Sequence, residues 1–134
     1  MLRVVSIVAA AAFSAAFVQP ERWAWLSSNA SGSVWYLDTD RSEMTGLNPR
    51  AWIRIDHSGD STMRGVRETL RRIHLDCANF RYRILSASSS TAAGRSVRDT
   101  GATPFSSFRP IEPNSPVEDL AAFVCETALH PPAR

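Results

Sequence analysis

Residues 115–125 read Ser-Pro-Val-Glu-Asp-Leu-Ala-Ala-Phe-Val-Cys, and this stretch decides how the rest of the chain is interpreted. It opens like a helix, with Ser at the N-cap, Pro at the first helical position and Glu at the third. Beyond Val117 the apolar side chains recur at spacings of three and four, which is typical of a helix with one buried face. Cys125 lies on that apolar stripe, and Pro131 and Pro132 end the predicted helix.

The second cysteine, Cys77, is the only other one in the sequence. An exported chain with two cysteines is expected to form one intramolecular disulfide, so we predict a structural bond between Cys77 and Cys125. Two free thiols and a bond between two chains are the alternatives. Because Cys125 lies on the buried stripe, the predicted bond joins that face of the helix to the end of the segment before Cys77.

The N-terminus indicates export. A lone basic residue precedes an apolar run from Val4 to Val18, which is the layout of a secretory signal peptide. The run is shorter than the roughly 20 residues that a membrane-spanning helix needs, and a retained anchor is the alternative. We expect residues 1–16 to be the signal peptide, with cleavage between residues 12 and 18. Residues 17–134 then form one domain with no stable membrane anchor, in the periplasm, at the cell surface or outside the cell.

The charge balance excludes one class of partner. The chain has 15 basic and 13 acidic residues and a formal net charge of +2. A balance this close to neutral provides no long-range attraction to nucleic acid or to an anionic membrane surface. We therefore expect no nucleic-acid partner.

Several segments before the helix have the patterns of β-strands. Alternation, or enrichment in β-branched and aromatic side chains, marks residues 33–38, 51–56 and 79–87. Residues 40–49 contain Gly, Asn and Pro and predict a loop. The Ser- and Ala-rich stretch 86–93 predicts the tip of a hairpin that returns through residues 95–99.

The stretch from Met63 to Cys77 is ambiguous. Its apolar residues recur at the helical spacing of three and four positions. Toward its end, Ile73, Leu75 and Cys77 also alternate with polar side chains, which is the period of a strand. Helix propensity alone favours a helix, so the pattern leaves both structures open.

Short motifs occur in a fixed order along about residues 22–127. They are the leading Trp23, Val34-Trp35-Tyr36-Leu37-Asp38, Ala51-Trp52-Ile53-Arg54, Leu75-Asp76-Cys77, Arg109-Pro110-Ile111-Glu112-Pro113-Asn114-Ser115 and Leu120-Ala121-Ala122-Phe123-Val124-Cys125. In this order they resemble the surface-adhesin protein E family, which consists of exported bacterial domains.

The resemblance implies an α+β fold. An antiparallel sheet of about six strands carries the C-terminal helix on one face, and the disulfide links the helix to the sheet. The resemblance also implies a strand over about residues 65–76.

The same resemblance implies a non-enzymatic binding domain with a protein partner, which contacts host matrix or envelope proteins. One alternative is a periplasmic envelope-structural or accessory domain with no host ligand. Another is a small periplasmic hydrolase or inhibitor.

No group of residues in the sequence predicts catalysis or a cofactor. His57, Asp60 and Ser61 lie too close together on one turn to form the line of a Ser-His-Asp relay. No metal-ligand spacing occurs among His57, His74, Asp76 and His130. We expect no catalytic residue, no metal and no cofactor.

One surface is a candidate for contact with a partner. It combines basic side chains on neighbouring predicted strands with two adjacent aromatic residues: Arg71, Arg72, Arg81, Arg83, Trp35 and Tyr36. Because Trp35 and Tyr36 face opposite sides of a strand, one of them is either covered by a second layer or exposed. The alternatives are a solvated sheet face for the arginines and cross-strand core pairs for the aromatic residues.

Overall fold

The structure, a computed structural model, describes residues 22–98 and 103–129, with the side chains of the helix described as far as Glu126. The predicted signal peptide and its cleavage site lie outside the described residues. Asp99, at the end of the predicted hairpin, and His130 lie outside them as well.

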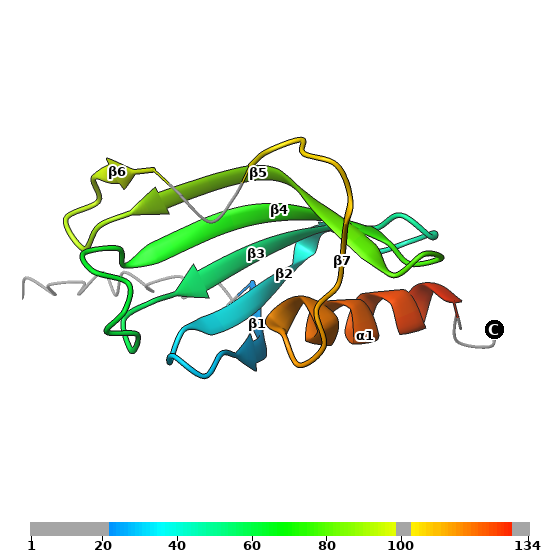
Figure 1. The fold of residues 1–134 in the computed structure, drawn as a ribbon, viewed down its shortest axis with the longest axis horizontal. Helices are drawn as coiled ribbons and strands as arrows, with labels where there is room; N and C mark the ends of the chain where they lie inside the picture. Colours follow the sequence, from blue (N-terminus) through cyan, green and yellow to red (C-terminus); the bar gives the residue numbers. More distant parts are fainter. Residues whose placement is uncertain (1–21, 99–102, 130–134) are drawn as a thin grey trace, which may run out of the picture.

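An antiparallel sheet and one helix make up the described chain (Figure 1). The elements are β1 (Trp23–Ser28), β2 (Val34–Glu43), β3 (Arg50–Asp56), β4 (Glu68–Asp76), β5 (Arg81–Ser90), β6 (Ser96–Val97), β7 (Arg109–Pro110) and α1 (Pro116–Leu129). Strands β1 to β6 lie side by side in chain order, and the short β7 pairs with β5. The predicted α+β fold, with a sheet of about six strands and a C-terminal helix, is confirmed.

The predicted strands at residues 33–38, 51–56 and 79–87 correspond to β2, β3 and β5. The ambiguous stretch forms a strand over Glu68–Asp76, close to the residues 65–76 that the family resemblance implies. Strand β4 pairs with β3 on one side and with β5 on the other. Helix propensity is the wrong guide here, because tertiary pairing along both edges of the segment overrides it.

The predicted loop at residues 40–49 is wrong at its start, because β2 continues to Glu43. The register between β2 and β3 is irregular between Asp38 and Glu43. There the Ser42 hydroxyl accepts a hydrogen bond from the backbone N–H of Trp52 at 2.9 Å and also donates to the Asp38 carbonyl. A serine side chain thus joins the two strands where the regular ladder is interrupted.

The predicted hairpin tip at residues 86–93 is shorter than expected. Strand β5 runs to Ser90, and the turn follows it, closed by a hydrogen bond from the Gly94 N–H to the Thr91 carbonyl. The returning strand β6 contains two residues, Ser96 and Val97, which pair with Ser90 and Ser89.

The hydrophobic core lies between one face of the sheet and α1. Alternate residues of the central strands are buried there: Trp35, Leu37, Ala51, Ile53, Ile55, Ile73 and Leu75. The helix contributes the predicted apolar stripe, with Val117, Leu120, Ala121 and Val124. The helix begins as predicted, since the Ser115 hydroxyl accepts a hydrogen bond from the Glu118 N–H at 3.3 Å.

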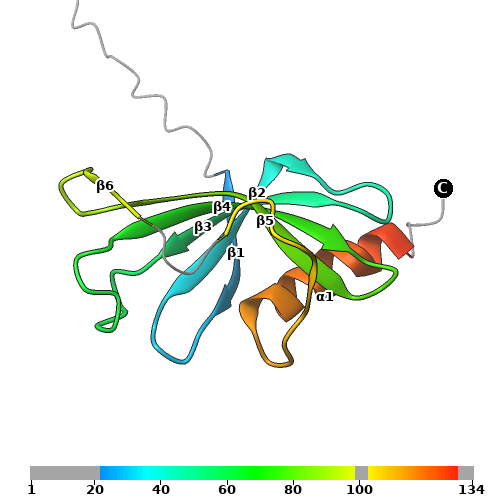
Figure 2. The same ribbon diagram turned by 45° about the horizontal axis from the view of Figure 1, so that its top comes forward.

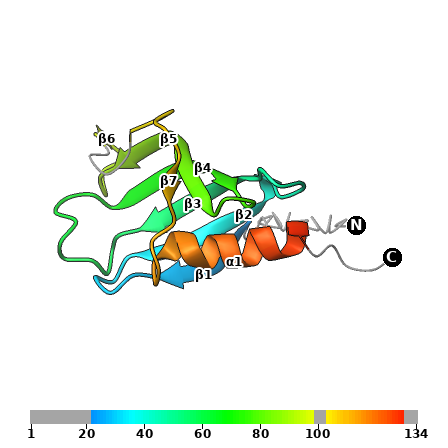
Figure 3. The same cartoon turned by 45° about the vertical axis from the view of Figure 1, so that its right-hand side comes forward.

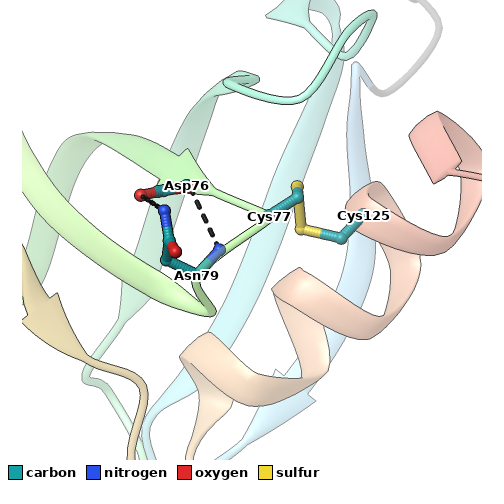
Figure 4. The surroundings of a disulfide bond; sticks show 4 residues. All are labelled: Asp76, Cys77, Asn79 and Cys125. Carbon is teal, nitrogen blue, oxygen red and sulfur yellow. Dashed lines mark hydrogen bonds between the residues drawn. A yellow bond between two sulfur atoms is a disulfide. The ribbon is translucent and has the colours of Figure 1, made fainter.

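The disulfide between Cys77 and Cys125 links the end of β4 to the buried side of α1 (Figure 4). The two Cα atoms are 5.4 Å apart. At the other end of the helix, the Ser27 hydroxyl of β1 donates a hydrogen bond to the Asp119 carboxylate at 2.5 Å. The helix is therefore attached to the sheet near both of its ends, along the face that Figure 3 shows.

A buried carboxylate organises the irregular part of β2. Asp38 is fully buried, and its Oδ1 accepts hydrogen bonds from the N–H groups of Asp40 and Arg41, both at 3.0 Å. Its Oδ2 pairs with the Arg41 Nε at 2.9 Å. Burial alone would raise the pKa of Asp38, but the hydrogen bonds from Arg41 and Asp40 outweigh it and hold the pKa below its usual value.

Removal of the disulfide is expected to destabilise the domain. Cys125→Ser should lower the free energy of unfolding by roughly 4 kcal/mol, because the bond closes a loop between residues 48 positions apart in the unfolded chain. Thermal denaturation under oxidising conditions measures the loss. Reductant should produce the same loss in the wild-type protein and no further loss in the variant. An unchanged midpoint in Cys125→Ser would show that the bond does not hold the helix.

The buried Asp38 carboxylate predicts a loss of stability in acid. A group whose pKa is lowered by folding stabilises the protein above its unfolded pKa, near 3.8, and this stabilisation disappears as pH falls through the folded pKa. Asp38→Asn should therefore be less stable at pH 7 and should lose less stability than wild type between pH 7 and pH 3. Urea unfolding at the two pH values measures this. The exposed neighbour provides the control: Asp40→Asn should have wild-type stability at pH 7.

Candidate functional site

The strand register divides the sheet into two faces. Residues directly opposite each other on antiparallel strands point to the same side of the sheet. Trp35 lies opposite Ile55 and faces the helix, whereas Tyr36 lies opposite Arg54 and faces away from it. Among the described elements, α1 lies along the first of these faces (Figure 2). We call the first the helix face and the second the open face.

The open face is a layer of arginine side chains stacked on aromatic rings. The Arg54 guanidinium lies 5.3 Å from the centre of the Tyr36 ring. The guanidinium groups of Arg41 and Arg72 lie 4.9 and 5.8 Å from the Trp52 ring. These are cation–π distances. Next to them on the edge strand β1, Trp25 is 66% exposed.

Carboxylates hold the same arginines from the side. Arg54 pairs with Glu68 at 2.9 Å, and Arg72 lies 3.5 Å from Glu43. An arginine that is both stacked on a ring and paired with a carboxylate keeps one orientation. A surface ordered in advance loses less side-chain entropy when it binds a partner.

A second aromatic group lies at the other end of the open face. Phe108, from the segment before β7, is stacked with Arg83 at 4.7 Å and Arg81 at 5.4 Å. Its ring centre is 5.3 Å from that of His74. Asp76 pairs with Arg81 at 2.8 Å, and hydrogen bonds from Arg81 and then Asn79 hold the pKa of Asp76 below its usual value.

The helix face continues beyond the N-terminal end of α1, where it forms a pocket of about 270 Å³. Arg71 and Trp35 line this pocket, together with Met63, Val66 and His57. The predicted partner residues are therefore separated: Arg72, Arg81, Arg83 and Tyr36 belong to the open face, and Arg71 and Trp35 to the helix face.

Two turns meet at the wall of this pocket. Gly32, in the β1–β2 turn, has a φ of 104° and approaches the turn after β3 so closely that a Cβ atom there would lie 2.4 Å from the Gly59 carbonyl oxygen. Only glycine allows this conformation and this approach. As a result, Ser33 lies beside His57 and Asp60.

A chain of buried polar side chains follows from this contact. The Ser33 hydroxyl donates to the Asp60 carboxylate at 2.7 Å and lies 2.7 Å from the His57 Nδ1. The Thr69 hydroxyl is 2.8 Å from the His57 Nε2 and 2.8 Å from the Ser89 hydroxyl. All five residues are buried. We call this chain the His57 network.

The His57 network does not have the geometry of a Ser-His-Asp relay. In such a relay the histidine stands between the carboxylate and the hydroxyl, and takes the hydroxyl proton. Here Ser33 stands in the middle and gives its proton to Asp60, so the His57 Nδ1 acts as a donor toward it. Hydrogen bonds from Thr62 and then Ser33 hold the pKa of Asp60 below its usual value. Ser61, the third residue of the sequence-based candidate, is exposed.

Among residues 22–98 and 103–129, no group of three or more His, Cys, Asp and Glu side chains is arranged to hold a metal ion. His57 is part of the buried network and His74 lies on the open face. In the same part of the chain, no helix has the length and apolar character needed to cross a membrane.

Side chains alternate between the two faces of a strand, and this decides which of the predicted partner residues share a face. Neighbours in sequence such as Arg71 and Arg72 necessarily face opposite sides of β4. The same alternation in β3 is a signal for Arg54, which is not among the partner residues predicted from the sequence. Phe108 lies in a Pro- and Ser-rich segment without periodicity, so no local signal could have placed it on the sheet.

Comparison with known proteins identifies one family. Residues 23–126 match the family model described as surface-adhesin protein E. The match spans the sheet, both cysteines and most of the helix. Searches of curated proteins and of solved structures find no match.

The His57 network is expected to be structural. Thr69→Val removes the hydroxyl that lies between His57 and Ser89 while keeping the shape of the side chain. The variant should lose about 1–3 kcal/mol of unfolding free energy, because buried polar groups are left without partners. Urea unfolding measures the loss, and the control is Thr39→Val, which makes the same change at an exposed position of β2 and should be as stable as wild type. Wild-type stability of Thr69→Val would show that the network does not stabilise the domain.

Proposed function

The chain belongs to the surface-adhesin protein E family, and we propose that it is a non-enzymatic, exported domain that binds a protein partner through the open face of its sheet. The partner class that the family supports best is a host extracellular-matrix protein. The adhesin-like, surface-protein character follows from the family itself. The partner and the contact surface are the proposal.

The observation that carries the proposal is the composition of the open face near β1. Tryptophan, tyrosine and arginine contribute most of the binding energy in protein interfaces. On the open face, neighbouring groups hold these side chains in place. Trp25 and Tyr36 lie opposite each other on β1 and β2, and Arg54 lies opposite Tyr36 on β3. The row therefore contains the three side-chain types that anchor protein complexes.

The shape of this region also supports a contact site. Trp23, Tyr36, Arg54 and Asp56 line a shallow pocket of about 230 Å³ on the same face. Trp25, at 66% exposure, stands beside it. A pocket next to a projecting aromatic ring suits a partner that inserts one side chain and packs another against the tryptophan.

The non-enzymatic part of the proposal is supported by the family and by the direction of hydrogen bonding in the His57 network. Ser33 donates its proton to Asp60 at 2.7 Å, so its oxygen is not prepared as a nucleophile. The network also lies on the helix face, away from the aromatic row of the open face.

The proposed surface predicts which substitutions weaken adhesion. The double variant Trp25→Ala, Tyr36→Ala should bind immobilised host matrix proteins roughly tenfold or more weakly than wild type, because it removes two aromatic anchors. The matched control is Phe123→Ala, which removes an aromatic ring that is 53% exposed on α1. Surface plasmon resonance gives the affinities, and thermal denaturation shows whether each variant is folded.

Equal binding by the double variant and wild type would exclude the open face near β1 as the contact surface. A loss of matrix binding in Phe123→Ala alone would show that the helix, and not the open face, is the contact surface. If the wild-type protein captures envelope proteins and no matrix component, the domain is a periplasmic accessory protein and the adhesive role is wrong.

A further inference from the structure

The end of the open face at β3 to β5 carries a row of nitrogen-bearing side chains. Arg50, His74 and Arg83 lie directly opposite one another on these three adjacent strands, so they point to the same side. Neighbouring strands are about 4.8 Å apart, so the row spans about 10 Å. Arg72 stands next to it, two residues before His74 on β4.

His74 orients this row without supplying charge. The Arg83 Nε donates a hydrogen bond to the His74 Nδ1 at 3.2 Å, and a ring nitrogen that accepts from arginine carries no proton. Burial, and then the positive charges of Arg83 and Arg50, lower the pKa of His74. His74 is therefore neutral, and the Arg83 charge remains uncompensated by it.

The nearby carboxylates leave an excess of positive charge. Asp76 is occupied, because its Oδ2 accepts from Arg81 at 2.8 Å. The same oxygen accepts from the Asn79 side chain at 2.9 Å, and its Oδ1 accepts from the Asn79 N–H at 3.2 Å (Figure 4). Glu43 lies opposite Arg50 on β2, and its carboxylate is 3.5 Å from Arg72. Within the described part of the chain, neither Arg50 nor Arg83 forms an ion pair. Three arginines thus face a single carboxylate, which is 66% exposed.

Aromatic rings support two of these arginines. Arg83 stacks on Phe108 at 4.7 Å, and Arg72 lies 5.8 Å from Trp52. The Arg83 Nε already donates to His74, so its two terminal Nη groups are the donors that remain for a ligand. These groups match the oxygens of sulfate or carboxylate in a forked arrangement, which makes arginine the preferred residue for such anions.

From this geometry we propose that the Arg50–His74–Arg83 row and Arg72 form an anion-binding site for a sulfated polysaccharide, separate from the protein contact near β1. The positive groups spread over three strands of an open surface, which suits a ligand with repeated anionic groups. The rings of Trp52 and Phe108 lie against the guanidinium groups of Arg72 and Arg83 and hold them in place. Because the row spans about 10 Å across three strands, it fits a stiff chain that carries anionic groups at intervals, as a sulfated polysaccharide does.

The test is the affinity for heparin of the full-length protein, expressed with its own N-terminus and purified after export. The variant Arg50→Gln, Arg83→Gln should bind heparin at least about tenfold more weakly, since it removes two charged donors. Glu43→Gln should bind more tightly than wild type, because it removes the competing carboxylate. The control is Arg95→Gln, which makes the same charge change at an exposed position in the turn before β6 and should bind as wild type.

Several outcomes would overturn the inference. One is heparin affinity of the double arginine variant equal to that of wild type, and another is an equal loss in Arg95→Gln. A third is displacement of heparin by polyglutamate as readily as by free heparin, which would assign the site to acidic proteins. Trp25→Ala, Tyr36→Ala should keep full heparin affinity. The polysaccharide site and the protein contact can therefore fail independently.

Discussion

The packing of one helix on one face of the sheet is the constraint on which the rest of the structure depends. The apolar stripe of α1 shares one buried core with Ile53, Ile73 and Leu75, and the Cys77–Cys125 bond fixes the helix to the end of β4. Because side chains alternate along a strand, each residue that faces the helix places its neighbours on the other side. The position of the helix therefore determines which residues form the open face.

The two faces satisfy their polar groups in different ways. On the helix face, beyond the N-terminal end of α1, the His57 network buries its hydroxyls and its carboxylate in a continuous chain of hydrogen bonds. On the open face, arginines lie across aromatic rings and pair with carboxylates that are partly exposed. The first arrangement stabilises the fold. The second leaves ordered donors and rings at the surface, which is a suitable arrangement for recognition.

Much of the fold could be predicted from the sequence. The cap at Ser115 and the stripe that contains Cys125 indicated the helix and its buried side, and alternation or β-propensity indicated β2, β3 and β5. Local patterns failed where tertiary pairing decides the structure: β4 has helical spacing, and β2 continues past Asp38 with the help of Ser42. For the candidate contact surface, the alternation of side chains along β2 could separate Tyr36 from Trp35 once the position of the helix was known. It could not bring Phe108 to His74, because that contact depends on the path of an irregular segment.

Hydroxyl-radical footprinting of the domain, free and bound to its captured matrix partner, tests whether the open face is the contact surface. Oxidation reports the solvent exposure of each aromatic side chain. We expect binding to protect Trp25 and Tyr36, while Phe123 on the solvent side of α1 is oxidised as in the free protein. Protection of Phe123 with unchanged oxidation of Trp25 and Tyr36 would contradict this expectation.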